Sequence, residues 1–261
     1  VRIGAPFDGG TFRDLGPPAL NNPGKVVFHA RVTRASEPNG AIDGIFTVGT
    51  GPVEMVVRDG QLTALNLPLE NFEDPVEVND RGDVVFMAGP LYDKGDVTLP
   101  LDGRSPGILV CTEGNIMTVV AYPGRTIGSD QITSFQLGPA AGSALAPPSI
   151  TPDGRVAFFA SLSGGSREAI ALWDGSPDFV AVHNTGGFGA DVTPAGGVYA
   201  ATESAAVIDA SGGLAFLARI AGGVTSEALI YQPTTGTGVP IVVGDAAPNS
   251  GFFAGNPFST P

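Results

Sequence analysis

The stretch Val78-Asn79-Asp80-Arg81-Gly82-Asp83-Val84-Val85-Phe86 decides the fold of this chain, because the same pattern occurs four times. The other copies occupy residues 20–28, 150–158 and 208–216. Each copy has an aliphatic residue, then Asn, Thr or Asp, two turn residues, Gly, one variable residue, two apolar residues and Phe. The chain is therefore built from four copies of one unit.

A β-hairpin explains each position of this motif. The Asn, Thr or Asp side chain can hydrogen-bond the backbone of the turn that it opens, and Gly adopts a positive φ at little steric cost. The apolar pair and the Phe suit a strand that is buried on one face. The sequence therefore predicts four turns with a glycine at positive φ and four equivalent buried phenylalanines. These structural residues are Gly24, Gly82, Gly154, Gly212, Phe28, Phe86, Phe158 and Phe216.

Two more strands are expected after each motif. The second strands are predicted at residues 44–48, 107–111, 169–173 and 228–231. Each of these begins with Gly or Ala, as if a neighbouring backbone lay close by. The third strands are predicted at residues 53–57, 116–120, 179–182 and 239–243. With the segment that leads into the next motif, each unit holds about four antiparallel strands, the size of a propeller blade.

The predicted fold is one all-β repeat domain over residues 1–261, a β-propeller of about four blades with one four-stranded antiparallel unit per repeat. An open stack of β units is the alternative, because four is a small number for a closed ring. Helix content is expected to be very low, with one helical turn considered for the Ala-rich residues 198–211.

The composition excludes several classes of protein. The formal net charge is −13, which disfavours nucleic acid and anionic membrane surfaces as partners. The single cysteine permits no intrachain disulfide, and no apolar run is long enough to span a membrane. Hydrophobic residues make up 43% of the chain, enough for a buried core. The absence of Met at Val1 indicates processing or trimming.

The motif resembles two kinds of repeat. Residues 153–158, Asp-Gly-Arg-Val-Ala-Phe, resemble the Pro-Asp-Gly-x-x-Ala-Phe signature of TolB-type β-propellers. The fuller pattern is similar to a group of bacterial exported or surface proteins, whose repeats read Ile-Asn-Asp-x-Gly-x-Val-Ala-Phe, then Gly-Ile-Phe, then Gly-Asp-x-x-Pro-Gly. The matching residues here are Asn79–Phe86, Gly44–Phe46 and Gly244–Pro248. The resemblance implies a β-propeller, export and surface display, and it carries over no catalytic residue.

Few residues could carry catalysis. Gly103-Arg104-Ser105-Pro106-Gly107 matches the G-x-S-x-G nucleophile elbow, but that motif needs a helix after the turn, and here a strand is predicted. His29 follows the motif Phe, in the position of Met87, Phe159 and Leu217, and is expected in the core or at an interface with its imidazole hydrogen-bonded. His183 ends a strand beside a glycine loop and is the one candidate general base or ligand, against a plain surface histidine. No catalytic residue is assigned.

Acidic residues are densest along residues 70–83. Asp80 and Asp83 are weak candidates for a calcium site, since calcium requires several converging oxygens and no EF-hand loop is present. A solvated acidic face is the simpler interpretation. Trp173 and Tyr231 lie on the second strands of two units and are expected in the core rather than as ligand platforms.

The two ends of the chain repeat the same piece, since Val1–Phe12 corresponds to Val242–Phe253. A ring of four blades needs this piece only once per blade, and a surplus strand is a template for another chain. We therefore expect a homo-oligomer or a head-to-tail filament formed through the terminal segments. The alternative is that the overlap reflects where a longer repeat array was cut.

These observations favour a non-enzymatic structural or binding protein, secreted or on the cell surface. The rival is a propeller enzyme that acts on glycans or peptides, which would gather two or more Asp, Glu or His in one pocket. A calcium-stabilised adhesion module is the third hypothesis. No cofactor other than calcium is indicated, and neither a nucleic-acid partner nor a membrane span is expected.

Overall fold

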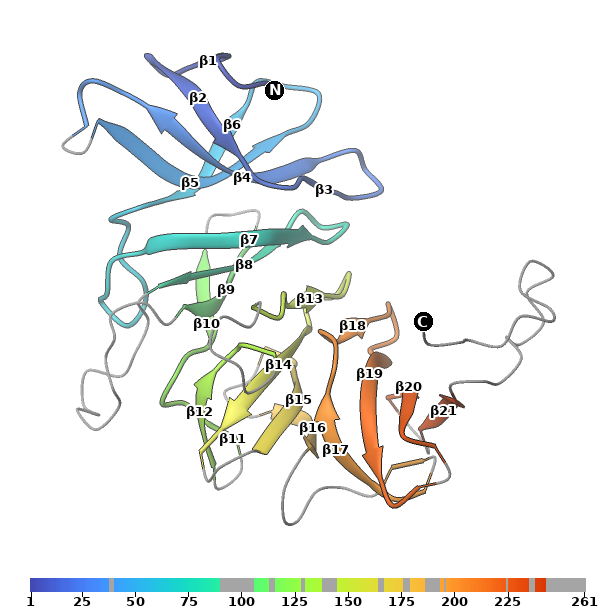
Figure 1. The fold of residues 1–261 in the computed structure, drawn as a ribbon. Helices are drawn as coiled ribbons and strands as arrows, with labels where there is room; N and C mark the ends of the chain where they lie inside the picture. Colours follow the sequence, from blue (N-terminus) through green and yellow to red (C-terminus); the bar gives the residue numbers. More distant parts are fainter. Residues whose placement is uncertain are drawn as a thin grey trace.

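The computed structural model describes residues 1–37, 40–89, 106–112, 116–127, 130–137, 145–163, 167–175, 179–185, 193–194, 196–223, 225–234 and 238–242. These residues form antiparallel sheets and contain no helix (Figure 1). In particular, the described part of the chain offers no long apolar helix that could cross a membrane. The all-β prediction is confirmed.

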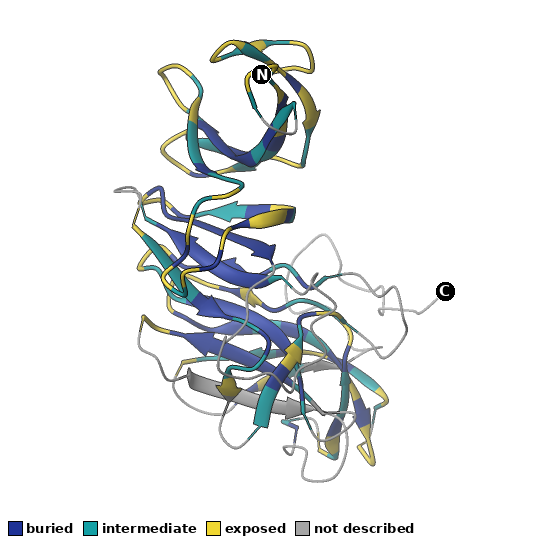
Figure 2. Cartoon of the chain, turned by 90° about the vertical axis from the view of Figure 1, so that its left-hand side faces the viewer, coloured by how far each residue is buried: buried dark blue, intermediate teal, exposed yellow. Residues whose placement is uncertain are grey.

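Each repeat forms one sheet of its own. The first sheet has the order β1-β2-β4-β5-β6, with β3 on β4, and curls into a half-barrel (Figure 2). Its strands are β1 (Pro6–Phe7), β2 (Gly10–Leu15), β3 (Ala19–Leu20), β4 (Val26–Thr33), β5 (Ala41–Val48) and β6 (Glu54–Arg58). The second sheet has the order β10-β9-β8-β7. Its strands are β7 (Glu70–Val78), β8 (Val84–Gly89), β9 (Gly107–Cys111) and β10 (Met117–Ala121).

The third and fourth sheets repeat this plan. The third has the order β11-β12-β14-β15-β16, with β13 on β14. Its strands are β11 (Thr126–Ile127), β12 (Asp130–Ser134), β13 (Ser149–Ile150), β14 (Val156–Leu162), β15 (Arg167–Trp173) and β16 (Phe179–Thr185). The fourth has the order β17-β19-β20-β21, with β18 on β19. Its strands are β17 (Val198–Thr202), β18 (Val207–Ile208), β19 (Leu214–Ala221), β20 (Glu227–Gln232) and β21 (Val239–Val242). The helical turn considered for residues 198–211 is wrong, because β17 and β18 lie there.

The motif turns have the predicted geometry. The four motif glycines have φ between 88° and 91°. In the second unit the Asn79 backbone N–H donates to the Asp83 carbonyl at 3.0 Å, and the Gly82 N–H donates to the Asn79 carbonyl at 3.0 Å. The Asn79 Oδ1 accepts the backbone N–H groups of Arg81 and Asp83. The side chain that opens the turn therefore fixes the turn, as predicted from its residue type.

Strand register is also the same in every sheet. Each motif Phe lies opposite the third residue of its second strand, in the pairs Phe28–Phe46, Phe86–Leu109, Phe158–Ala171 and Phe216–Ile230. These four phenylalanines are all buried, with at most 4% of their surface exposed. In the first unit the small residue predicted to open the second strand is Gly44, and it lies against a neighbouring backbone as expected. A Cβ on Gly44 would collide with the Val57 carbonyl oxygen.

The sheets stack in chain order, and each motif Phe faces the preceding sheet. Phe86 shares a core cluster with Val27 of the first sheet, and Phe158 shares one with Val85 of the second. Phe216 lies with Ala157 of the third sheet. The first unit has no preceding sheet, so the half-barrel covers Phe28 with its own aromatic rings. These rings are Phe7, Phe12 and Phe46.

Extensive packing between sheets joins neighbours only. β4 packs on β7, β7 on β13, and β13 on β18. The described strands of the first and fourth sheets share no comparable packing, and the four sheets form a curved stack (Figure 1). A closed four-blade propeller is therefore not confirmed by these contacts.

The N-terminal residues pair within their own sheet. β1 pairs with β2, and β2 pairs with β4, in the way that β11 and β12 extend the third sheet onto β14. The corresponding C-terminal piece, residues 242–253, lies outside the described residues beyond Val242.

Candidate functional site

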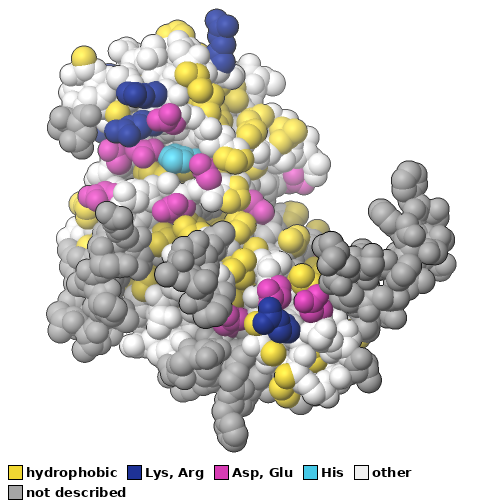
Figure 3. All heavy atoms as spheres, in the orientation of Figure 1, with side chains coloured by type: hydrophobic (Ala, Val, Ile, Leu, Met, Phe, Trp, Pro, Cys, Tyr) yellow, Lys and Arg dark blue, Asp and Glu magenta, His cyan; other side chains and the backbone are white. Residues whose placement is uncertain are grey.

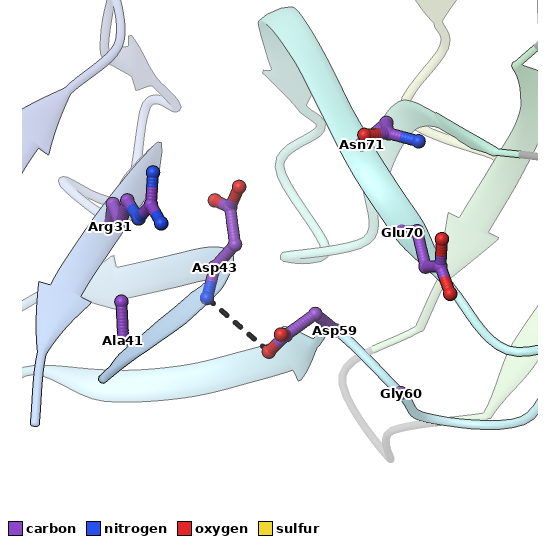
Figure 4. A pocket seen from close by; sticks show the side chains of 7 residues that line it. All are labelled: Arg31, Ala41, Asp43, Asp59, Gly60, Glu70 and Asn71. Atoms are coloured by element: carbon purple, nitrogen blue, oxygen red, sulfur yellow. Dashed lines mark hydrogen bonds between the residues drawn. The ribbon is translucent and has the colours of Figure 1, made fainter. Parts of the chain in front are cut away.

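A polar cleft of about 470 Å³ opens where the first sheet meets the second. Arg31, Asp43 and Asp59 project from the first sheet, and β7 contributes Glu70 and Asn71 from across the gap (Figure 4). Ala41 and Gly60 complete the lining. Acidic and basic side chains gather on this part of the surface, around a histidine (Figure 3).

Strand register places these groups. Arg31 on β4 lies opposite Asp43 on β5. Asp59 follows the last residue of β6, and its Oδ1 accepts the Asp43 backbone N–H at 3.3 Å. The cleft therefore depends on the edge of the first sheet and on the start of β7.

His29 lies beside the cleft, between two carboxylates from different sheets. Its Nε2 is 2.6 Å from Asp43 Oδ1, and its Nδ1 is 3.3 Å from Asp74 Oδ2. Asp43 belongs to β5 of the first sheet and Asp74 to β7 of the second. A carboxylate only accepts, and a neutral imidazole donates from one nitrogen, so the imidazolium alone donates in both contacts. His29 is thus an interface residue with a hydrogen-bonded ring, as predicted.

Opposing effects act on the pKa of His29. Burial lowers the pKa, but the hydrogen bond and charge of Asp43, together with those of Asp74, outweigh burial and leave the pKa raised above 6.5. Burial also raises the pKa of Glu73 on β7, against the opposing charge of His29. The site therefore favours a positive charge on His29.

The Asp74 carboxylate also lies close to Gly16 of the first sheet's loop. A Cβ on Gly16 would collide with the Asp74 carboxylate, so this side chain lies against the backbone of the loop before β3. The Gly16 N–H also donates to the His29 carbonyl oxygen at 2.9 Å. Gly16 therefore positions both partners.

The arrangement can bind charged or polar groups. Arg31 offers a guanidinium, Asn71 an amide, and three acids offer carboxylates. The described residues that line the cleft include no Ser, Thr or Cys, so its side chains offer carboxylates rather than a hydroxyl or thiol. Cys111 is buried in the core instead, and burial raises the pKa of its thiol to about 11.

Sequence reasoning identified His29 but missed Asp43, Asp74 and the cleft. The sequence signals were an acid within the second strand of the first unit and the acidic run on β7. His183 lies on β16, paired with Ile170, and its side chain is outside the described residues. Residues 103–105 of the elbow motif also fall outside them, and Gly107 begins β9 rather than a helix.

The two weak metal candidates are engaged in other contacts. Asp83 is buried, and its carboxylate accepts from Asn79 Nδ2 at 3.0 Å and pairs with Arg81 at 2.7 Å. Asp80 accepts from the backbone and side chain of Asn22. Within the described residues no group of three His, Cys, Asp or Glu is arranged to hold a metal ion.

The simpler interpretation of this acidic run, a solvated face, is correct for some members only. Glu70 and Asp80 are exposed, whereas Glu77 is half-buried and accepts the Ile150 N–H at 3.3 Å. The run therefore also joins the second sheet to the third.

Motif side chains also hydrogen-bond from one sheet to the next. Asn21 Nδ2 donates to the Asn79 carbonyl at 2.9 Å, and Asn79 Nδ2 donates to the Thr151 carbonyl at 2.9 Å. Between the third and fourth units the donor is Arg155 Nη2, which lies 3.5 Å from the Ala210 carbonyl. We call this series the turn ladder, and it always runs from one unit to the next.

The turn ladder ends at the fourth unit. Its motif residue is Asp209, which has no amide, and its carboxylate accepts from Ser211 and from the Tyr231 hydroxyl at 2.7 Å. The hydrogen bonds from Ser211 and Tyr231 hold the pKa of Asp209 well below its usual value.

Of the two aromatic residues expected in the core, one is there. Trp173 is buried between the second and third sheets. Tyr231 is half-buried on the opposite face of its sheet, so that expectation is wrong. Trp173 pairs with Val156, whereas Tyr231 pairs with Ala215, one position further along the motif. A shift of one residue moves a side chain to the other face of a strand.

No curated protein matches the chain. The model of a family of unknown function (DUF7453) matches residues 5–256. Because this match covers nearly all of the sheets described above, the chain belongs to the family of unknown function DUF7453.

Proposed function

We propose that this chain is an exported, non-enzymatic repeat protein of the extracellular space or cell surface, which acts through structure and binding. The turn ladder carries the proposal. In the first three motifs a polar side chain bonds the next sheet, so this chemistry is architectural. Closure of the four sheets into a propeller ring is proposed as the alternative to docking on the fourth sheet, because a closed ring would place the first sheet against that face. Association with further copies also belongs to the proposal.

Two routes of self-association are open. One is strand addition through the chain ends. Residues 1–12 contribute to the first sheet, so the end that would add to another chain is residues 242–253. The other uses a sheet face and is argued below.

Cellular location tests the proposal directly. The tagged protein is expressed in bacteria of the kind that encodes it, and its exposure is measured by protease treatment of intact cells and by assay of the medium. We expect protein in the medium, or surface protein that the protease removes. Retention in the cytoplasm of intact cells would contradict the proposal.

An enzyme acting on glycans or peptides is the second candidate, because Asp43, Asp59 and Glu70 line one cleft beside His29. The test is hydrolysis of a panel of glycans and peptides by the wild type and by Glu70→Gln. Turnover that Glu70→Gln abolishes would establish the enzyme. Turnover that survives in Glu70→Gln would assign the activity to another site or to a contaminant.

A calcium-stabilised adhesion module is tested by melting temperature. Under the leading proposal, EDTA and added calcium leave the melting temperature unchanged. A fall in EDTA that calcium reverses would instead support a calcium site.

A further inference from the structure

The face of the fourth sheet that points away from the third sheet is apolar. We call it the outer face and define it by Val198, Val207, Leu217, Leu229 and Val239. Cross-strand pairs place these residues on one side. The pairs are Val207–Ala215, Leu217–Leu229, Tyr231–Val239 and Val198–Ala221. Their neighbours along the strands, among them Tyr199, Phe216 and Ile230, are buried against the third sheet.

The outer face is exposed to an unusual degree. Val207 is 62% exposed, Val239 56%, and Val198 and Leu229 38% each. In the described part of the chain after Ile116, these four are the exposed large hydrophobic residues. A contiguous apolar patch of this kind usually marks an interaction site.

Equivalent positions in the other sheets are covered. Leu229 corresponds to Ile45, Ile108 and Ile170, each of which is fully buried. Ile45 packs against the second sheet, and Ile170 packs against the fourth. The outer face therefore continues an interface that this protein uses at every internal junction, but no described sheet covers it.

Serial addition of another unit does not fit the ends of the stack. The first sheet has already covered its corresponding face with Phe7 and Phe12. The fourth unit ends the turn ladder, because Asp209 has no amide and Gly213, which stands in the position of Arg155, has no side-chain donor for a following turn. A second outer face, in contrast, is apolar and is left uncovered by the described sheets.

The outer face also carries charged side chains, which suit a two-fold contact. Arg219 lies on β19 between Leu217 and Ala221, pairs with Glu203 at 2.5 Å and lies opposite Glu227. In a two-fold arrangement each copy presents the same patch, and an arginine can face a carboxylate of the other copy. Two sheets packed in this way bury their apolar side chains between them.

We propose that a second copy of this chain docks on the outer face of the fourth sheet, so that two fourth sheets pack face to face about a two-fold axis. This inference rests on the proposed structural and binding function and names its surface. It predicts a closed dimer, whereas strand addition through the chain ends would build longer assemblies.

The test is the mass of the full chain in solution, measured by light scattering after size exclusion and by native mass spectrometry at rising concentrations. We expect the mass to rise to that of two chains and to stop there. Leu229→Glu and Val207→Glu should each return it to that of one chain, because a carboxylate in a dry interface is unpaired. Leu62→Glu is the matched control, since Leu62 is 58% exposed outside this face, and it should still dimerise. Circular dichroism confirms that each variant is folded.

Three results would overturn the inference. The first is a wild type that is monomeric at every concentration, and the second is a dimer that survives both charged variants. The third is growth beyond two chains, which would indicate strand addition through the ends. If the wild type is a monomer and Leu229→Glu lowers its melting temperature, other residues of the same chain cover the outer face. None of these results bears on export. The test of cellular location and the test of the dimer can therefore give opposite answers.

Discussion

His29 illustrates how a single residue is defined by side chains that are distant in sequence. Its two carboxylate partners lie 14 and 45 residues away, and Asp74 belongs to another sheet. The same strand position holds Met87 and Phe159 in the second and third units, where both side chains are buried in the apolar core. The first junction therefore has a charged side chain at a position where the second and third units have an apolar one, and its strength should depend on pH.

Replacing His29 with Gln tests this dependence. The pKa of His29 is raised in the folded protein, so its stabilising contribution is complete below about 6.5 and is lost as the pH rises through the raised pKa. The urea midpoint of the wild type should therefore fall relative to that of His29→Gln across this window. Glu73 is a neighbouring acid whose pKa is also raised. Burial raises this pKa, the charge of His29 opposes the effect, and the charge of Asp74 adds to it. The ordinary pKa of Glu73, 4.5, lies below the 6.5 of His29.

A second variant tests the same contact from the side of Asp74. Gly16→Ala should weaken the pH dependence as His29→Gln does, because the new Cβ displaces the Asp74 carboxylate. Parallel curves for the wild type and His29→Gln would show that the imidazole does not bind the two sheets together.

At the scale of elements, the motif hairpin has two functions. Its backbone forms a tight turn, and in the first two units its Asn side chain bonds the turn of the next sheet. The Phe that follows packs on the preceding sheet. One hairpin thus contacts the sheets on both sides, which explains why its residue types recur.

Asn21→Asp separates the two functions of the turn residue. Aspartate can still accept the Lys25 N–H, as Asp209 accepts the Gly213 N–H, but it cannot donate to the Asn79 carbonyl. We expect a loss of about 0.5–1.5 kcal/mol in the free energy of unfolding, because the Asn79 carbonyl keeps the Gly82 N–H as a donor and loses only the hydrogen bond from Asn21. Asn21→Ala should lose more, since it also removes the acceptor in the turn. Equal losses for the two variants would mean that the bond between sheets contributes nothing measurable.

Phe86→Ala tests the packing of the motif. Phe86 is fully buried between the first and second sheets, so its truncation should cost about 3–5 kcal/mol in the free energy of unfolding. Leu229→Ala is the comparison, because Leu229 is 38% exposed and should cost much less in the monomer. Denaturant unfolding measures both. A loss below about 1 kcal/mol for Phe86→Ala would show that the motif Phe is not a core residue.

For the whole molecule, the two ends of the stack differ. The first sheet closes over its own phenylalanines, and the fourth leaves an apolar face uncovered. Deletion of residues 1–14 removes β1 and most of β2, and with them Phe7 and Phe12. We expect this deletion to lower the melting temperature and to increase binding of an apolar dye, because Phe28 and Phe46 lose their cover.

The same deletion separates the two assembly routes. Docking through the fourth sheet leaves the mass of the assembly at two chains, since that face is far from the deleted strands along the stack (Figure 1). Loss of the assembly, with the fourth sheet intact, would assign the contact to the N-terminal segment. The measurement is native mass spectrometry of the deleted and full chains side by side.

The sequence by itself determined the repeat, the strand positions and the turns, because these depend on local chemistry. Glycine at positive φ, a turn-capping Asn or Asp, and alternating apolar residues act within a few positions of one another. The predicted second strand at residues 107–111 matches β9 residue for residue. The buried motif phenylalanines follow from the same alternation.

Only the tertiary structure decided which side chains meet across sheets. Asp43, His29 and Asp74 come together because β7 packs on β4, and nothing in the local pattern of either strand encodes that contact. The exposed outer face has the same physical cause. Its residues match buried ones position by position, and their exposure depends on whether another sheet lies against them.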